Sequence, residues 1–484
     1  MRTPAAAGSR ARWDAVAPAL RRVFATESVA ASVRGWVDPE TAFLALAAPG
    51  DDVVWFDNGP EAEHGTSLIG WAAPTAPRLL AREADGTRLH PAPGMSTTSV
   101  TVDVPILDLL RESLPPALSS LLPAWVGWFG HELGVSSLGV PTSTAGIQAA
   151  AVLVDRGIVF DHHTRQVRVV GPADERQWVQ DRLRATEALV YAHPPLPPPP
   201  ARAPGPVTRA HPDDRYLTLI RRCQDLIRAG QAYQLCLTNQ WRTAYPASPS
   251  SVYRRLRRIA PSHHGGLLRI GTTQLLSASP ERFLEVNRDR TVVTRPMKGT
   301  RPRGATTAQD LAMVEELISS PKERAENLMI VDLVRNDLSR VCELGTVTVE
   351  ELFAVETYRT VHQLVSTVSG RLREGLNAVD AFAALFPAGS MTGAPKRRAV
   401  ELLHDLESVA RGSYAGAFGY FAADGSADLA TTIRTIHLDE WGASFGTGGG
   451  ITIDSDPAAE LREMHLKAQA LLQSLGLTRT DERA

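Results

Sequence analysis

Hydrophobic and polar positions follow different patterns on the two sides of a proline-rich stretch. Before residue 193, short apolar runs alternate with clusters of turn residues, a pattern typical of strands mixed with some helix. The strands predicted there cover residues 52–56, 124–129, 149–154 and 166–170. After residue 207, apolar residues recur at helical spacing over 216–227, with Asp213 or Asp214 as cap and Gly230 as stop. Strand-like runs follow at residues 234–238, 267–270, 275–278, 282–286 and 291–294.

The last third of the chain mixes helical and strand patterns. Helices are predicted near 307–319, from about 322 to 340, and after Asp456-Pro457. The arginine-rich run at 253–259, YRRLRRI, is most simply the solvated face of a helix. Because helices and strands do not alternate regularly, the pattern predicts an α+β fold with large antiparallel sheets.

The segment HPPLPPPPARAPGPV, residues 193–207, contains eight prolines and predicts an extended linker. We therefore expect a strand-rich N-terminal region over residues 1–192 and a catalytic region over 208–477. A short tail would follow at 478–484. The residues that could carry chemistry all lie in the second region.

Charge and cysteine usage narrow the class of protein. The 484 residues carry 51 basic and 53 acidic side chains, a net charge of -2, which argues against a nucleic-acid or anionic-membrane partner. The three cysteines have no paired spacing, so neither a disulfide framework nor a zinc site is indicated. No apolar run is long enough for a signal peptide or a membrane span, and we expect a cytoplasmic protein.

Lysine is rare in this chain, where only four of the 51 basic residues are not arginine. A preference for arginine across the genome explains most of this depletion. Lysine remains useful where a compact charge is needed or where the amine must lose its proton. We therefore expect chemistry at some of the four positions, which are Lys298, Lys322, Lys396 and Lys467.

Two helices each carry a pair of glutamates three residues apart on an otherwise apolar stripe. The pairs are Glu323 with Glu326 and Glu460 with Glu463. A carboxylate on an apolar face persists only if it is paired or binds a cation. Each pair alone could be a solvated helix start or an ordinary glutamate-to-lysine surface pair. Two such pairs together favour a Mg²⁺ site, since Mg²⁺ takes one or two carboxylates and oxygens of an anionic substrate.

Three loop-like segments add further candidates. In residues 294–304, TRPMKGTRPRG, neighbouring cations would favour the neutral, nucleophilic form of Lys298. The same segment is also consistent with a solvated turn or an anion-binding surface. Residues 446–457, GTGGGITIDSDP, offer backbone N–H groups for a carboxylate or phosphate. Residues 386–396, FPAGSMTGAPK, offer the same together with hydroxyl groups. Simple glycine turns remain an alternative for both glycine-containing segments, and no nucleotide-binding motif is present.

Taken in order, several long motifs closely resemble the chorismate-utilising enzymes across about residues 210–475. They are YQLCLT, SASPERF, RPMKGTRPRG, ERAENLMIVDLVRNDL, VHQLVSTVSG, FPAGSMTGAPK, IRT and GGGITIDSDPAAELREMHLKA. The N-terminal region is similar to the first part of the family's ammonia-using large subunits. The resemblance implies a two-sheet antiparallel α/β sandwich that encloses chorismate and Mg²⁺.

The resemblance also implies roles for individual residues. Glu326 and Glu463 would bind Mg²⁺, with Glu323 and Glu460 as nearby acids, and Glu281 would protonate the departing C4 hydroxyl. His362 and Ser390 would line the pocket near the ring. The substrate carboxylates would be held by Tyr414, Arg434, Gly448, Gly449 and Lys467.

Two positions distinguish the branches of the family. Members that use water as nucleophile carry a lysine where this chain has Gln234, so the resemblance implies ammonia as nucleophile. Enzymes that form anthranilate usually read P-I-A-G-T, whereas those that form 4-amino-4-deoxychorismate read P-I-K-G-T, and this chain reads P-M-K-G-T with Lys298. We expect this chain to form 4-amino-4-deoxychorismate through a covalent Lys298 intermediate, with formation of anthranilate as the alternative.

The expected chemistry also implies a partner. Ammonia would come from a separate glutamine amidotransferase subunit, because none of the three cysteines lies in a G-x-C-x-G context. The product would serve 4-aminobenzoate and folate synthesis or a secondary metabolite, a choice that the sequence leaves open.

Overall fold

Strand β8 (Ala149–Asp161) joins the two halves of the fold in a computed structural model of the chain. The structure describes residues 20, 23–74, 76–83, 86–90, 99–115, 121–142, 146–192, 195–201, 204–246, 248–358, 361–477 and 482–483. The first half of β8 pairs with β7 (Ala124–Phe129), and its second half pairs with β3 (Thr66–Ala72). Two arms of antiparallel sheet therefore start from one long strand.

The strand order of both arms follows from their ladders. The first arm runs from β8 and β3 through β2 (Val53–Asp57), β12 (His264–Ile270), β13 (Thr273–Ser279), β22 (Thr435–Asp439) and β23 (Gly442–Ile451) to β11 (Gln234–Thr243). The second runs from β7 through β20 (Ala417–Ala422), β21 (Ala427–Thr431), β14 (Arg282–Val286) and β15 (Thr291–Thr294) to β18 (Val361–Arg371). β18 also pairs with β16 (Met297–Pro302) and β17 (Thr348–Thr357).

Short strands complete the edges of this arrangement. β9 (Gln166–Pro172) and β4 (Arg78–Glu83) pair with β8, and they carry β1 (Ser28–Ser32), β5 (Gly86–His90) and β6 (Val100–Val102). β10 (Val207–Arg209) lies beside β11, which also pairs with β19 (Gly393–Ala394). Across the described residues, the pairing of β10 with β24 (Glu482–Arg483) is parallel and the other ladders are antiparallel.

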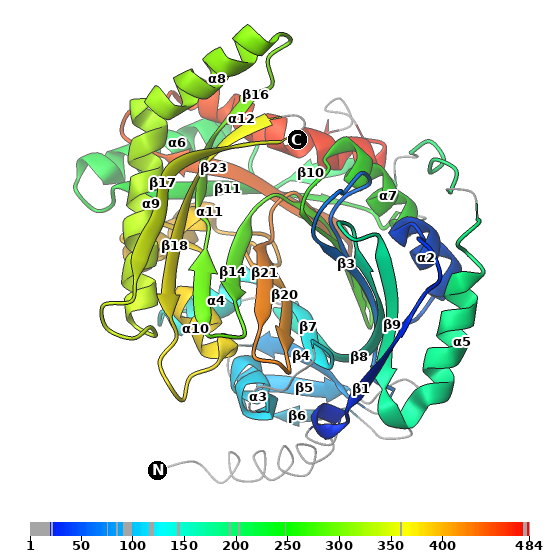
Figure 1. The fold of residues 1–484 in the computed structure, drawn as a ribbon. Coiled ribbons are helices and arrows are strands. Elements are labelled where there is room, and N and C mark those ends of the chain that lie inside the picture. Colours follow the sequence, from blue (N-terminus) through cyan, green and yellow to red (C-terminus); the bar gives the residue numbers. More distant parts are fainter. Residues whose placement is uncertain are drawn as a thin grey trace.

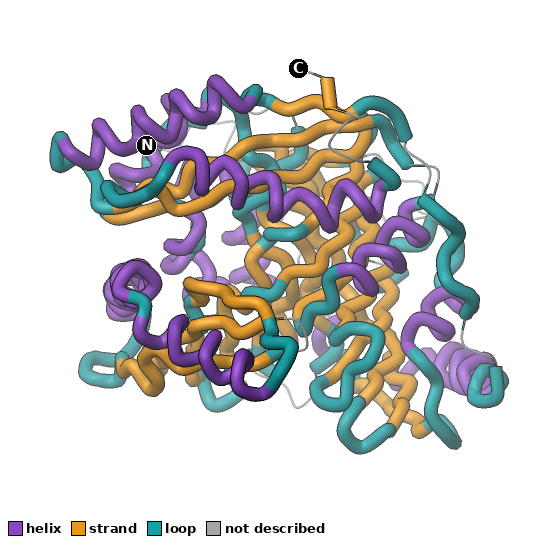
Figure 2. The backbone as a smooth tube through the Cα atoms, turned by 90° about the horizontal axis from the view of Figure 1, so that it is seen from above, coloured by secondary structure: helices purple, strands orange, loops and turns teal. Residues whose placement is uncertain are grey.

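The two arms pack face to face, and helices cover their outer faces. One apolar cluster joins residues of both arms, such as Val54 and Leu268 from the first and Trp128 and Phe418 from the second. Two larger clusters pack the outer faces against helices, and Figures 1 and 2 show most helices outside the strands. The predicted α+β fold, a large two-sheet antiparallel sandwich, is confirmed.

Three helices that matter for the site begin close to where the sequence predicts them. They are α8 (Thr307–Ser319), α9 (Pro321–Ser339) and α12 (Pro457–Leu475). The side chain of Ser320 caps α9 and that of Asp456 caps α12, and in each helix proline occupies the first turn. α12 ends at Gly476, whose φ of 76° is the left-handed conformation that glycine adopts at helix ends.

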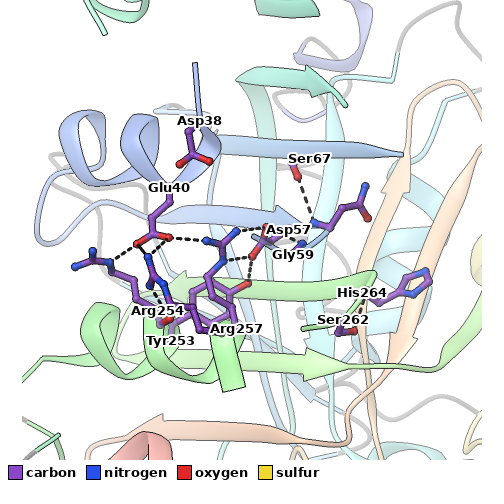
Figure 3. A network of polar contacts seen from close by, with 12 residues as sticks. Asp38, Glu40, Asp57, Gly59, Ser67, Tyr253, Arg254, Arg257, Ser262 and His264 are labelled. Atoms are coloured by element: carbon purple, nitrogen blue, oxygen red, sulfur yellow. Dashed lines mark hydrogen bonds and ion pairs between the residues drawn. The ribbon is translucent and has the colours of Figure 1, made fainter. Parts of the chain in front are cut away.

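The prediction of a solvated arginine-rich helix face at 253–259 is wrong for two of its residues. The segment lies in α7 (Pro249–Ile259), where Arg254 and Arg257 are buried. Their guanidinium groups bind Glu40 of α2 (Pro39–Leu46), and Arg257 also binds Asp57 at the end of β2 (Figure 3). The partners lie about 200 residues away in the sequence, so the local pattern carries no sign of them.

Strands from both sides of residues 193–207 belong to the same ladders. β2 pairs with β12 over five residues, and β7 pairs with β20 over six. Of the expected tail at 478–484, residues 478–481 and 484 lie outside the described residues. No helix in the described part of the chain is long and apolar enough to cross a membrane.

Candidate active site

The candidate site lies where the far ends of the two arms come together. The second arm contributes β16 and α9, and the first contributes β23, β11 and α12 (Figure 1). Lys322 at the start of α9 lies 3.5 Å from Glu460 on α12, which links the two helices across the site. The structure therefore gathers elements that are separated by up to about half of the chain.

The four glutamates of the two helices lie close enough to influence one another. Burial raises the pKa of Glu326, and the charges of Glu323 and Glu460 add to the shift, although Lys298 and Lys322 partly offset it. Glu463 behaves differently, because Lys467 lies 2.8 Å away. Burial opposes ionisation of Glu463, but the nearby lysines outweigh it and hold the pKa below its ordinary value.

These carboxylates fit a Mg²⁺ ion better than a metal that needs a full protein cage. Among the described residues, no group of three or more His, Cys, Asp or Glu side chains is gathered tightly enough to hold a metal ion. Mg²⁺ commonly takes only one or two carboxylates and completes its shell with water and substrate oxygens. The ammonium of Lys322 already stands between carboxylates of both helices, 3.9 Å from Glu326 and 3.5 Å from Glu460, so a cation is accommodated there.

Lys298 is a half-buried residue of β16 that faces acids of this site. Its positive charge acts to lower the pKa values of Glu281, Glu326 and Glu463, and the adjacent Gly299 lies against α9, since a Cβ there would be 3.0 Å from Glu323 Oε2. Asn327, the neighbour of Glu326, anchors the strand start, since its amide donates to the carbonyl of Pro296 at 3.4 Å. The lysine thus lies inside the site and not on a solvated turn.

The arginines around Lys298 do not act as the sequence predicts. Arg295 pairs with Glu356, Arg301 with Glu316 and Glu323, and Arg303 with Asp310. Their charges are compensated by acids from α8, α9 and β17. Each arginine beside Lys298 is therefore neutralised by acids of its own, which removes the basis for the expected effect of these charges on the lysine.

Glu281 is buried beside Ser390 in a mostly apolar setting. Burial raises the pKa of Glu281, while a hydrogen bond from Ser390 and the charges of Lys298 and Lys467 act in the other direction. The Ser390 hydroxyl donates to Glu281 Oε1 at 2.8 Å. A small cavity lies beside this pair and is also lined by Ile330. A carboxyl group with a raised pKa can serve as a proton donor.

The glycine-rich segment forms the end of strand β23 and not a loop. Gly449 pairs with Leu237 of β11, and β23 pairs with β22 only at Gly442–Ser444. Lys467 donates to the carbonyl oxygen of Gly448 at 2.8 Å, so the backbone groups of Gly448 point away from β11. A Cβ at residue 449 would lie 3.0 Å from Glu460 Oε2, so the strand edge approaches the carboxylates closely.

Three further predicted residues line the same region. Gln234 is buried, and its amide oxygen has no hydrogen-bond partner among the described residues. The ring of Tyr414 packs on Gly446, where a Cβ would lie 2.2 Å from the ring. Arg434 has a φ of 49°, and burial lowers the pKa of its guanidinium. Within the described residues, that guanidinium has no recorded hydrogen bond or ion pair, as expected for a group that binds a ligand.

His362 forms its hydrogen bonds with residues of α8 and β17. Its ring lies 2.9 Å from Asp310 of α8 through Nε2 and 2.9 Å from the Thr357 hydroxyl through Nδ1. Successive residues of a strand point to opposite faces. Gln363 follows His362 in β18 and is also buried, and it therefore points to the opposite face from His362. The contacts described for His362 do not include Ser390 or Glu281.

Two cations near the site have buried partners that the sequence could not reveal. Lys396 donates to Asp337 of α9 at 2.6 Å and to the Leu385 carbonyl at 2.7 Å. Arg411 binds Glu407 and donates to the Met391 carbonyl next to Ser390. The rarity of lysine pointed to Lys396, but Arg411 lies in no distinctive motif.

Comparison with known proteins gives the family to which this fold belongs. The family model for chorismate binding enzymes matches residues 88–473. The chain belongs to the chorismate binding enzyme family.

Relatives in this family carry two activities in their names. The aminodeoxychorismate synthases of Streptomyces griseus and Streptomyces pristinaespiralis are 41% and 39% identical, each over 90% of this chain. The alignments span 63% and 64% of those two proteins, so the chain covers less than two thirds of their length. Anthranilate synthase component 1 of Pseudomonas putida is 36% identical over 91% of this chain and 93% of its own.

Solved structures share the fold of this chain. Anthranilate synthase component I from Streptococcus pneumoniae superposes with a TM-score of 0.72 at 27% identity, over 91% of this chain and 100% of that chain. The menaquinone-specific isochorismate synthase MenF from Escherichia coli shares the fold, with a TM-score of 0.67 at 17% identity, over 96% and 99% of the two chains.

Proposed function

We propose that the chain is component I of an aminodeoxychorismate synthase, which converts chorismate and ammonia to 4-amino-4-deoxychorismate and water. The observation that carries this proposal is the position of Lys298, a half-buried residue of β16 whose neighbour Gly299 lies against Glu323 of α9, where a Cβ at residue 299 would be 3.0 Å from Glu323 Oε2. The names of the Streptomyces relatives agree with it.

In the first proposed step, the neutral amine of Lys298 attacks C2 of chorismate as the C4–O bond breaks. Glu281 donates its proton to the departing hydroxyl, which leaves as water, and the ring double bond shifts. In the second step, ammonia attacks C4, the C2–N bond breaks and Lys298 leaves as an amine. The new C4 ammonium returns a proton to Glu281, so Glu281 is protonated again and Lys298 is a free amine. The new nitrogen lies para to the ring carboxylate.

Other residues would hold the substrate in place. The carboxylates would be held by the guanidinium of Arg434, the strand edge at Gly448 and Gly449, and Lys467, with Tyr414 packed on the same strand at Gly446. The amide oxygen of Gln234, which has no hydrogen-bond partner among the described residues, would accept a hydrogen bond from ammonia. A Mg²⁺ ion held by Glu326 and Glu463, with Glu323 and Glu460 nearby, would supply a Lewis acid that binds and polarises a substrate carboxylate.

Ammonia would be delivered by a separate glutamine amidotransferase subunit, because the described cysteines are buried and suit no glutaminase. Anthranilate synthase component I is the second candidate, favoured by the Pseudomonas putida relative, which aligns over 93% of its length.

Mass spectrometry of the purified chain with chorismate and Mg²⁺, without ammonia, tests the proposal. We expect an adduct on Lys298 in the wild type and none in Lys298→Ala. A second assay adds ammonia and follows the product, which should be 4-amino-4-deoxychorismate. Formation of anthranilate, at the same rate in both proteins, would favour the second candidate and remove the covalent role of Lys298.

A further inference from the structure

Lys322 occupies an unusual place for a cation. It lies in the first turn of α9, directly after Pro321, where the positive end of the helix dipole disfavours a positive side chain. It is also one of only four lysines in a chain that otherwise uses arginine. The helix dipole disfavours the positive charge of Lys322, and the chain otherwise uses arginine. The lysine at this position therefore requires another source of stabilisation.

The contacts of Lys322 provide that source. Its ammonium lies 3.5 Å from Glu460 Oε1 on α12 and 3.9 Å from Glu326 Oε1 on its own helix. Burial disfavours the charge, but Glu460, Glu326, Glu323 and Glu463 outweigh it and raise the pKa of Lys322. One ammonium therefore compensates carboxylates from both helices.

These contacts are loose in comparison with the neighbouring ion pair. Lys467 lies 2.8 Å from Glu463 and also donates to Gly448, whereas both Lys322 contacts are longer and its side chain is 51% exposed. A lysine has a flexible stem and no planar fork, so it can leave such a site more easily than an arginine.

We propose that Lys322 is an exchangeable counter-ion of the carboxylate site, which holds Glu326 and Glu460 together in the metal-free protein and yields its place when a divalent cation binds. The proposal deepens the proposed function and rests on its Mg²⁺ site. Lys322 then competes with Mg²⁺, so the metal binds more weakly than the carboxylates alone would allow. In return, the four acids do not repel one another when the metal is absent.

The test compares Mg²⁺ binding by Lys322→Met and by the wild type, with isothermal titration calorimetry on the full chain and MgCl2 alone. We expect the variant's dissociation constant to fall by roughly two- to fivefold, the range that one partly exposed ion pair provides. In EDTA, the variant should melt at a lower temperature than the wild type, and saturating Mg²⁺ should raise its Tm by more. Lys322→Arg keeps the charge but leaves the site less easily, so its Mg²⁺ affinity should be no higher than that of the wild type.

Arg335→Met is the matched control. Arg335 lies on the same helix, its side chain is 52% exposed, and it pairs at 3.5 Å with Asp332, away from the glutamates. Its loss changes the net charge equally and should leave Mg²⁺ affinity unchanged. Unchanged or weaker Mg²⁺ binding by Lys322→Met would overturn the counter-ion role while the metal site stands. A wild type that binds no Mg²⁺ would refute both the counter-ion role and the proposed metal site.

Discussion

At the scale of single residues, spacing revealed the acids of the site but not their partners. Glu323 with Glu326 and Glu460 with Glu463 share helix faces, because residues three apart lie on one side of a helix. Their spacing in the sequence predicts that the arginines beside Lys298 act on its charge, yet they pair with acids such as Glu316 and Glu356. Those acids come from other elements, so no local pattern could reveal the pairing.

The hydrogen bond between Ser390 and Glu281 leads to a prediction about pH. This bond lowers the pKa of Glu281 against the effect of burial, so Ser390→Ala should raise it further. A general acid is active while protonated, and activity is lost as pH rises through its pKa. We expect the alkaline limb of the kcat/KM profile to move to higher pH in the variant.

Ser113→Ala serves as the control for this profile, since Ser113 is also a buried serine with a hydrogen bond, on α3 (Ile106–Ser113). Its profile should keep the wild-type midpoint. A limb that stays in place or moves downward in Ser390→Ala would show that Glu281 is not the group that titrates there.

At the scale of elements, α9 carries several parts of the site along one helix. Glu323 and Glu326 lie near its start, Asn327 holds the beginning of β16, and Asp337 lies near its end. The boundaries of α9 could be predicted from its cap and its apolar spacing. The contact of Asp337 with Lys396 could not be predicted, because the two residues lie 59 positions apart. Local spacing does not show how the chain between them folds back.

The Asp337 and Lys396 pair predicts a non-additive effect on stability. Burial raises the pKa of Asp337 and lowers that of Lys396, so each charge depends on the other. Asp337→Asn or Lys396→Met should each lower the free energy of unfolding by about 3–5 kcal/mol, since each leaves one buried charge unpaired. The double variant should lose clearly less than the sum, as measured by urea unfolding. Strictly additive losses would mean that the pair is not coupled.

At the scale of the whole molecule, the sequence pointed to the fold class through the family motifs and the absence of βαβ alternation. The order of the strands in the two arms could not be predicted from the sequence, because β2 and β12 pair across about 200 residues. The network of Glu40, Asp57 and Arg257 reinforces that junction, with Tyr253 donating to Asp57 at 3.0 Å. It lies far along the first arm from the candidate site and should matter for stability rather than for chemistry.

Asp57→Ala tests this network. The substitution leaves the buried guanidinium of Arg257 with Glu40 alone, and we expect the free energy of unfolding to fall by about 3 kcal/mol or more. The folded variant should keep the wild-type KM for chorismate. Asp332→Ala, which removes an exposed partner of Arg335, should change stability by less than about 1 kcal/mol. Equal effects of the two substitutions would contradict a special role for the buried network.

The ladders that cross the proline-rich segment set a limit on dissection of this protein. A fragment that begins at residue 208 would keep β12 and β20 but would lose β2 and β7, their hydrogen-bonded neighbours. Each orphaned strand would present a row of free amide and carbonyl groups, a template on which other chains can assemble. A recombinant piece limited to the motif-bearing region is therefore expected to aggregate, even though it would contain almost every residue of the site.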